Sequence, residues 1–370
     1  MARILLLGYF GAGNFGDEAL LADWLIRHGR FFRDQNFDID VVVRGDKLLP
    51  GIPSSRQLLD SVSQLVPQKQ ALRLDPRDYQ VLVLPGGSIL QDSSSVKSLL
   101  YYLWFIRRFT QSTCRVLLLN QGIGPISSWL GSTLTPIVLR NTDMLSLRDE
   151  QSMQWAQKHR VDSGNCRLVQ SCDPILLYDQ PPLSGFDGSQ LPARYFAYIP
   201  RRSGDLPAPD DLVSEAQAAA TLIRHVREQT GMDCLVLPYA PEDLGFAQEI
   251  VAECVGDAQL APGVDQPQPD YWQLTRHAQL VITSRLHGLI AAAGALVPCL
   301  GIAIDPKISQ IGTELGFPWC FPATQHREDT FSTFADLWNE REHVRTHLED
   351  KLKELRELLH RSDEQFRQLI

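Results

Sequence analysis

Residues 3–20 read RILLLGYFGAGNFGDEAL, which places an apolar run, a glycine-rich turn and the start of an amphipathic segment in succession. The run predicts a strand over Arg3–Gly8, because short aliphatic runs are typical of strands buried on both faces of a parallel sheet. Apolar residues at helical spacing then predict a helix over Glu18–Phe32. A strand, a glycine turn and a helix in this order indicate the opening unit of a doubly wound α/β domain.

The same alternation of short apolar runs and amphipathic segments continues along the 370-residue chain. The stretch Asp179–Pro192 is dense in Pro, Gly, Ser and Asp, which is typical of a linker. We therefore expect two Rossmann-like doubly wound domains, over residues 1–180 and 181–335. The further strands predicted are Phe37–Val43, Val81–Leu84, Arg115–Leu119, Met144–Leu147, Tyr195–Ile199, Cys234–Pro238, Leu280–Thr283 and Leu300–Ile304, with second-half helices near Asp211–Gln229, Pro241–Cys254 and from Gly288 onward.

The C-terminal segment is strongly charged but carries an apolar stripe at helical spacing. The stripe consists of Val344, Leu348, Leu352, Leu355, Leu359 and Phe366. It predicts an amphipathic helix over residues 336–370 that packs on the protein itself, since its polar face mixes both signs of charge. Two doubly wound domains that face each other imply a ligand cleft at the carboxyl ends of their strands.

Composition excludes several classes of protein. With 44% hydrophobic and 21% charged residues the chain has the profile of a soluble globular protein. Its 35 Lys and Arg against 44 Asp and Glu give a net charge of −9, which excludes a general nucleic-acid-binding surface. The seven scattered cysteines lack a C-x-x-C pair, so we expect reduced thiols, no zinc site and no disulfide framework. No signal-peptide pattern or spanning segment is visible, and we expect a cytoplasmic protein.

Three glycine-bearing turns follow strands of the first domain. The first departs from a dinucleotide fingerprint because Asp17 and Glu18 follow its glycines at once and would repel a pyrophosphate. Carboxylates there suit sugar hydroxyls, although a tight turn in which Asn14 or Asp17 caps the helix fits the pattern equally. The second and third turns, at Gly86-Gly87 and after Gln121, favour one crowded sheet edge.

Basic residues follow strands in both domains. Arg148 ends a strand of the first, and Arg201, Arg285, His287 and Lys307 follow strands of the second. Guanidinium groups match carboxylates and phosphates, and a histidine at a helix start suits acid–base work. Together they would form a basic pocket for a small polyanion. The alternative is structural: a local Arg148–Asp149 ion pair, a packed histidine and a solvated lysine.

These motifs together resemble those of the polysaccharide pyruvyl transferases, which include bacterial cell-surface-anchoring enzymes. The resemblance spans about residues 3 to 310, and Leu147 and Ser284 stand where other members often differ. Its four pieces are GYFGAGNFGDEAL at 8–20, PGGSILQD at 85–92, SLRD at 146–149, and SRLHG at 284–288 followed by IDPK at 304–307.

The resemblance implies a GT-B-like pair of Rossmann-type domains and a transfer of pyruvate from phosphoenolpyruvate. The product would be a cyclic pyruvate ketal on a sugar of a cell-surface polysaccharide or of its lipid-linked precursor. Catalytic roles fall on His287, Arg148 and Lys307, and donor binding on Arg285, Arg201 and Gly288. The acceptor side is implied to comprise Gly11, Asn14, Asp17, Glu18, Gly86, Gly87 and Gln121.

Neither metal nor cofactor is expected beyond phosphoenolpyruvate as co-substrate, and a lipid-linked acceptor would bring the protein to the inner face of the membrane. Two other functions fit the sequence. A nucleotide-sugar glycosyltransferase on the same fold would use a carboxylate such as Asp305 or Glu314 near a strand end. A non-catalytic saccharide-binding protein would keep the fold without the chemistry.

Overall fold

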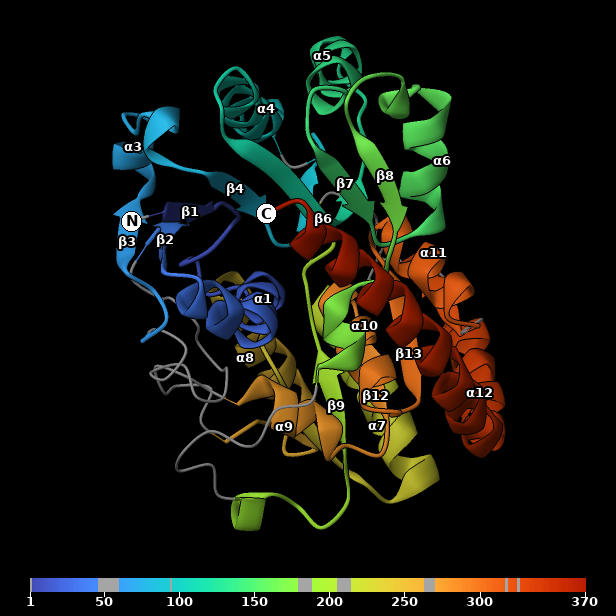
Figure 1. Ribbon diagram of the computed structural model, residues 1–370. Helices are drawn as coiled ribbons and strands as arrows, with labels where there is room; N and C mark the ends of the chain where they lie inside the picture. The colour runs from blue at the N-terminus through green and yellow to red at the C-terminus, as the bar shows by residue number, and fades with distance from the viewer. Residues whose placement is uncertain are drawn as a thin grey trace. The chain divides into compact units, whose positions relative to one another are not determined.

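The chain forms two compact units, seen in a computed structural model that describes residues 2–45, 60–93, 95–178, 188–204, 214–262, 270–316, 319–324 and 327–370. The first unit runs to Leu177 and takes in Glu354–Ile370, and the second comprises Tyr178–Lys353. Each unit holds a parallel sheet with helices against it (Figure 1). Most of the predicted linker, at 179–187, lies outside the described residues.

The first unit contains an eight-stranded sheet whose order reverses at its first strand. β1 has β2 on one side and β4 on the other, with Ile4 opposite both Ile39 and Val81. All pairs are parallel, as predicted from short aliphatic runs. The order is β3 (Gln64–Pro67), β2 (Phe37–Val43), β1 (Ala2–Leu6), β4 (Val81–Leu84), β6 (Arg115–Ile123), β7 (Met144–Leu147) and β8 (Arg167–Gln170), with β5 (Gly87–Leu90) paired to β6.

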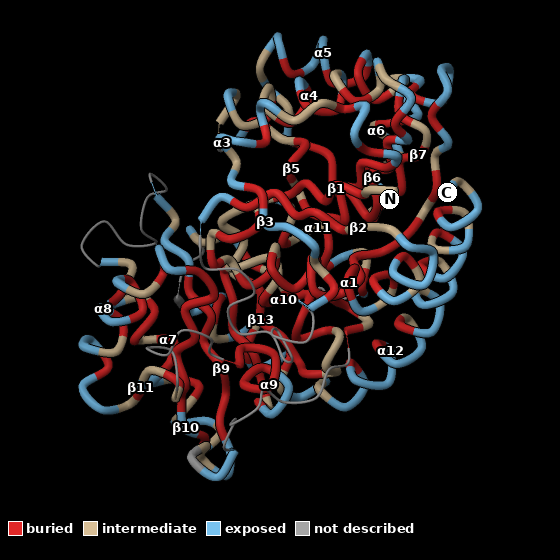
Figure 2. The backbone as a smooth tube through the Cα atoms, turned by 60° about the vertical axis from the view of Figure 1, so that its left-hand side comes forward, coloured by how far each residue is buried: buried red, intermediate tan, exposed pale blue. Residues whose placement is uncertain are grey.

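Helices cover both faces of this sheet (Figure 1). Alternate strand residues such as Leu5 and Leu82 join a core with Leu99 and Phe105 of α4, while α1 packs on the opposite face. The central strands β4 and β7 are buried along their whole length, and Figure 2 shows the buried backbone in the middle of the sheet. The helices are α1 (Phe15–Asp34), α3 (Gln68–Ala71), α4 (Val96–Thr110), α5 (Trp129–Leu139) and α6 (Glu150–Lys158), with 3-10 turns η1 (Pro76–Asp78), η2 (Val161–Ser163) and η3 (Pro174–Leu177).

The second unit contains a six-stranded parallel sheet whose order also reverses at its first strand, β9. Ser214 and Gln217 form a capping box at the start of α7, and Gly231 ends that helix in the left-handed conformation. The sheet order is β11 (Ala258–Leu260), β10 (Asp233–Val236), β9 (Tyr195–Ile199), β12 (Val281–Thr283), β13 (Cys299–Ala303) and β14 (Cys320–Pro322). The helices are η4 (Gly188–Gln190), α7 (Glu215–Thr230), η5 (Pro241–Asp243), α8 (Leu244–Cys254), α9 (Tyr271–Arg276), α10 (Leu286–Gly294) and α11 (Pro306–Glu314).

The predicted strands agree with the structure within two residues at each end, except that β6 extends to Ile123. The predictions omit β3, β5, β8, β11 and β14. These strands have three or four residues each, and most carry exposed or polar positions that break an aliphatic run.

A single long helix, α12 (Arg327–Gln368), ends the fold and begins nine residues before the predicted boundary at 336. All of the predicted apolar stripe except Leu355 is buried. Its residues up to Lys353 belong to the second unit and those from Glu354 onward to the first. Among the described residues, no helix has the length and apolar character that crossing a bilayer requires.

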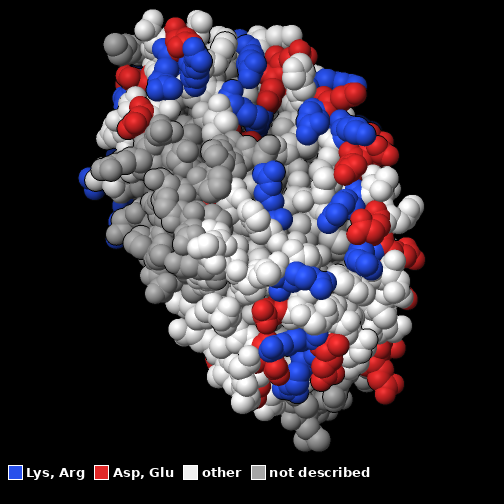
Figure 3. Space-filling model, turned by 90° about the horizontal axis from the view of Figure 1, so that it is seen from below, with Lys and Arg blue, Asp and Glu red and all other residues white. Residues whose placement is uncertain are grey.

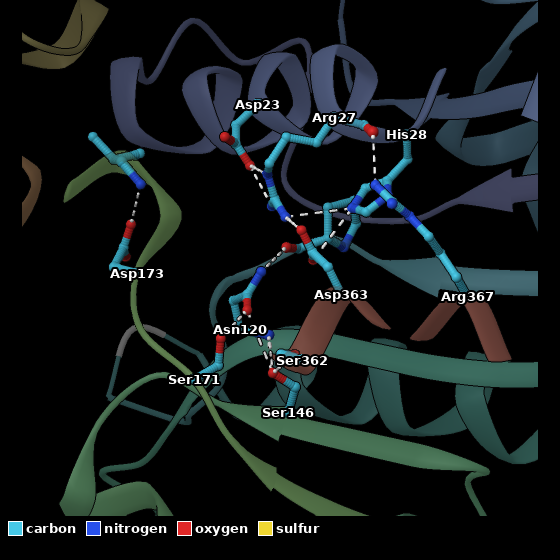
Figure 4. Close-up of polar contacts among 12 residues, drawn as sticks. Asp23, Arg27, His28, Asn120, Ser146, Ser171, Asp173, Ser362, Asp363 and Arg367 are labelled. Atoms are coloured by element: carbon cyan, nitrogen blue, oxygen red, sulfur yellow. Dashed lines mark hydrogen bonds and ion pairs between the residues drawn. The ribbon is translucent and has the colours of Figure 1, made fainter. Parts of the chain in front are cut away.

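The last turns of α12 are held to the first unit by an ionic cluster, which we call the Asp363 cluster (Figure 4). Arg27 donates to Asp23 at 2.8 Å and also to Asp363, and the buried His28 lies 3.4 Å from Asp363. Burial raises a carboxyl pKa, but the hydrogen bond with His28 and the charge of Arg27 hold the pKa of Asp363 at about 2. The Phe366 ring meets His28 edge-on at 4.9 Å between centroids.

A chain of hydroxyl and amide groups makes a second connection from α12 to the sheet (Figure 4). The Ser362 hydroxyl lies 2.8 Å from that of Ser146 in β7. Asn120 in β6 accepts from Ser171 at 2.8 Å and lies within 3.4 Å of Ser146. These buried polar groups satisfy one another, so the helix is fixed by specific pairs as well as by its apolar stripe.

Candidate active site

The first glycine loop, between β1 and α1, is shaped by Glu18. This fully buried carboxylate accepts hydrogen bonds from the backbone N–H of Gly11 at 2.7 Å and of Gly13 at 3.4 Å. Gly11 has φ +80°, and a Cβ there would lie 2.8 Å from the carbonyl oxygen of Gly45. The acceptor contact at Glu18 stays a prediction, and the structure shows its carboxylate buried against the loop that it holds.

The sequence leaves two roles open for Asn14 and Asp17, which are capping the helix and contacting sugar hydroxyls. Asn14 caps α1, since its side chain accepts from the Gly16 N–H at 3.1 Å. Asp17 is half-buried in the first turn, and a Cβ at Gly87 would lie 3.6 Å from its Oδ1. The structure thus brings Asp17 beside Gly86-Gly87, because β1 and β4 are neighbours at the point where the strand order reverses. Ligands bind at such points in open parallel sheets.

Gln121 is fully buried and ties strands together. Its Nε2 donates to the carbonyl oxygens of Leu84 at 3.1 Å and of Leu119 at 2.8 Å. The acceptor contact at Gln121 stays a prediction, and the structure shows this side chain bridging β4 and β6 inside the unit.

Arg148 is also buried, and it has closer partners than the Asp149 considered for it in the sequence. It donates to Asp173 at 2.6 Å and to Ser88 at 2.6 Å, while its Nε lies 3.7 Å from Asp149. Gly122 leaves the space for the guanidinium, since a Cβ there would lie 2.9 Å from Arg148 Nε. In this conformation Arg148 positions the segments that follow β4, β7 and β8, and it presents almost no surface to a ligand.

In the second unit the ends of β9 and β12 are joined by Ser284. Its hydroxyl accepts from the Arg201 N–H at 2.6 Å and donates to the Arg201 carbonyl at 3.1 Å. The Arg201 side chain is exposed at this edge. The neighbouring Arg202 instead reaches Glu249 at 2.6 Å and lies over the Phe246 ring.

Arg285 is engaged by two carboxylates of the segment η5. It donates to both oxygens of Asp243, at 2.8 and 2.6 Å, and to Glu242 at 3.0 Å. Burial opposes the charge on Arg285, but the hydrogen bonds and charge of Asp243 outweigh it and raise the guanidinium pKa. The donor contact at Arg285 stays a prediction, and the structure shows this side chain in an ion pair within the second unit.

Gly288 serves packing. A Cβ there would lie 2.3 Å from the Thr283 hydroxyl, which accepts from the Arg285 N–H at 3.0 Å. The donor contact at Gly288 stays a prediction, and the structure shows that this buried glycine lets α10 start close to β12. His287 stands just before it, half-buried in the first turn of α10.

Lys307 lies in the first turn of α11 after β13, as His287 lies in the first turn of α10 after β12. Asp305 caps α11 by accepting from the Lys307 N–H at 3.0 Å, and the Lys307 side chain is half-buried. The strands β9, β12 and β13 are neighbours, and parallel strands end at one sheet edge. Arg201, His287 and Lys307 thus follow three adjacent strands, and the starts of α10 and α11 add the positive ends of two helix dipoles.

The sequence analysis does not identify the roles of three carboxylates. Asp173 pairs with Arg148, Asp243 pairs with Arg285, and Glu18 accepts from the backbone of its own loop. The residues predicted to be catalytic are divided between the units, because Arg148 belongs to the first and His287 and Lys307 belong to the second. Over the described ranges, no three His, Cys, Asp or Glu side chains are grouped so as to hold a metal ion.

Two Rossmann-like parallel-sheet units followed by a C-terminal helix define a GT-B fold, and solved structures agree. The chain is similar to sucrose-phosphate synthase from Thermosynechococcus elongatus, with TM-score 0.59 at 11% identity over 100% of this chain and 99% of that one. A UDP-GlcNAc 2-epimerase from Methanocaldococcus jannaschii has TM-score 0.57 at 10% identity over 90% and 91%. A glycosyltransferase from Rickettsia africae has TM-score 0.53 at 10% identity over 99% and 98%.

The sequence defines the family within this fold. The family model of the polysaccharide pyruvyl transferases matches residues 14–306, which is most of the chain. This protein therefore belongs to the polysaccharide pyruvyl transferase family, as the motifs indicate. No curated protein matches it at a significant level.

Proposed function

We propose that this protein transfers pyruvate from phosphoenolpyruvate to a sugar residue of a cell-surface polysaccharide or of its lipid-linked precursor, forming a cyclic ketal. Membership of the family supports pyruvyl transfer in polysaccharide biosynthesis generally. The observation that supports this donor is the succession of Arg201, His287 and Lys307 at the ends of three adjacent strands.

Phosphoenolpyruvate carries a carboxylate and a phosphate on a small carbon frame, so its site needs several positive groups. In the proposed site Lys307 and Arg201 supply charge, and the N-terminal turns of α10 and α11 supply backbone N–H groups. Phosphoenolpyruvate then serves as co-substrate, and the proposal includes no metal or other cofactor.

The proposed reaction begins with proton transfer. His287, as imidazolium, protonates the methylene carbon of the donor, which becomes the methyl group. One sugar hydroxyl adds to the electron-poor C2 and loses its proton, and the C2–O bond to phosphate breaks with release of inorganic phosphate. A second hydroxyl then adds to C2, losing its proton and closing the ketal. One donor and one diol thus give one ketal and one phosphate.

The acceptor is proposed to lie at the β1 and β4 strand ends of the first unit. There Asp17 is half-buried beside the turn Gly86-Gly87 and suits hydrogen bonds from sugar hydroxyls. Gly11 and the cap Asn14 lie in the loop just before α1, where their hydrogen bonds with Glu18 and Gly16 fix its shape.

Labelled transfer tests the proposal. Purified protein is incubated with phosphoenolpyruvate carrying a carbon label and with saccharides from the envelope of cells that lack this gene. We expect label in the saccharide fraction as acid-labile pyruvate, with an equal amount of inorganic phosphate released. Phosphate release without labelled saccharide, or labelled transfer from a nucleotide sugar in its place, would contradict the proposal.

A further inference from the structure

The outer side of α4 and α5 exposes an apolar surface, which we call the α4–α5 face. It consists of Trp104, Trp129, Leu130, Leu134 and Ile137. Trp129 is 76% exposed and the other four between 36% and 44%. These five make up half of the ten large hydrophobic side chains exposed in the described part of the chain. The two helices pack side by side in the first unit (Figure 1).

Most of the α4–α5 face consists of side chains of α5. Leu130, Leu134 and Ile137 follow one another at helical spacing on its outer side, while Val138 and Leu139 pack inward. The helix carries no charged side chain at all. A surface helix normally places polar groups toward water, so an apolar outer side indicates that something else covers it.

The stretch of sequence that carries α4 and α5 has charged side chains of a single sign. Residues 93–142 contain five Lys and Arg and no Asp or Glu, in a chain with net charge −9. Lys97 and Arg107 are exposed on α4, and the Arg108 guanidinium lies 5.3 Å from the centroid of the Trp104 ring. On the face shown in Figure 3 the two signs are interspersed.

We propose that the α4–α5 face docks on the surface of an anionic lipid bilayer. Tryptophan favours the headgroup region because its ring is apolar and its N–H is polar, and the leucines and isoleucine enter the acyl boundary. Lysine and arginine at the rim meet the negative surface potential while their stems cover apolar area. The predicted C-terminal stripe on α12 takes no part, since nearly all of it is buried.

A second copy of this chain fits the face less well than a membrane. In a symmetric dimer the same patch meets itself, so Lys97 and Arg107 of one copy would lie near those of the other with no acidic residue of this stretch to offset them. Membrane docking needs neither substrate nor chemistry, so it is independent of the proposed pyruvyl transfer.

Vesicle flotation tests the docking. The full chain is mixed with vesicles of phosphatidylcholine alone or with added phosphatidylglycerol. We expect binding that requires phosphatidylglycerol and weakens with salt. The double variant Trp129→Ser, Leu134→Ser should lose about tenfold or more in partitioning, and Lys97→Glu, Arg107→Glu should lose the dependence on phosphatidylglycerol. Val255→Ser is the matched control: Val255 is 88% exposed in the second unit, and its replacement should leave binding unchanged.

Three results would overturn the inference. The first is wild-type protein that does not float with vesicles of any lipid composition. The second is that the apolar and charge variants bind the vesicles as well as wild type does. A wild-type dimer that Trp129→Ser, Leu134→Ser converts to monomer would assign the face to a second copy. A second assay separates docking from the proposed reaction. With water-soluble saccharides as acceptors, both face variants should release phosphate from phosphoenolpyruvate within a few-fold of the wild-type rate.

Discussion

Replacing His287 with glutamine is expected to lower the rate of phosphate release from phosphoenolpyruvate by about 10²–10⁴-fold. Glutamine keeps a polar side chain of similar size but cannot deliver a proton to the methylene carbon. Donor affinity should change little, because the proposed charge contacts come from Lys307 and Arg201. The expected signature is a large fall in kcat with a small change in donor dissociation constant.

His277 supplies the matched control for this experiment. It lies in the same unit at the end of α9, with its Nδ1 2.8 Å from the Gln273 carbonyl oxygen. His277→Gln should retain turnover within a few-fold. If His287→Gln also turns over within a few-fold of wild type and binds the donor normally, His287 has no role as the acid.

Asp363→Asn is expected to lower the free energy of unfolding of the first unit by about 3 kcal/mol. The substitution removes one of two carboxylates from Arg27 within the Asp363 cluster, where burial leaves water little access to replace it. The effect falls at the lower end of the range for broken buried pairs because Asp23 continues to bind Arg27. Hydrogen–deuterium exchange of α1 and of the last turns of α12 measures it locally.

The Asp363 cluster also makes the free energy of unfolding of the first unit depend on pH. Because the pKa of Asp363 is about 2 in the folded state and its ordinary value is 3.8, its contribution is complete above about pH 4 and is lost as the pH falls toward 2. Burial lowers the pKa of His28 below 6.5, so stability due to neutral His28 also falls as the pH drops below 6.5.

Two variants separate these effects. Glu364→Gln changes an exposed carboxylate one position further along α12 and should cost less than about 0.5 kcal/mol, as surface pairs do. His28→Gln should flatten the loss of stability between pH 6.5 and 5 while leaving the loss below pH 4 in place. An Asp363→Asn protein as stable as Glu364→Gln would contradict the structural role of the cluster.

The sequence predicts the strands, the two sheets and the residue types at their ends because each leaves a local signal. Aliphatic runs mark strands, and glycine or a capping side chain marks the turn that follows, as at Gly11 and Asn14. The short edge strands β3, β8, β11 and β14 leave no such signal, since their positions are partly exposed and their pairing comes from the neighbouring strand.

The sequence does not reveal which charged residues pair with one another. Arg148 pairs with Asp173, 25 positions away, and Arg285 with Asp243, 42 positions away. Both pairs are set by which strands lie together. The nearest charge in sequence, Asp149, does pair with Arg148, but at 3.7 Å it is the more distant of the two carboxylates. The role of the buried Glu18 escapes for a related reason: its carboxylate accepts from backbone N–H groups, and these donors carry no residue-specific pattern.

The most direct test of the proposed donor is the melting temperature of the full chain with phosphoenolpyruvate, beside a UDP-sugar. Ligand at about a hundred times its dissociation constant adds about 2.7 kcal/mol, which raises the melting temperature by several degrees. We expect phosphoenolpyruvate to give this shift in wild type and in Arg202→Ala, whose side chain pairs with Glu249, and to lose it when Arg201→Ala and Lys307→Ala are combined. A shift with the UDP-sugar and none with phosphoenolpyruvate would contradict the donor assignment and favour glycosyl transfer.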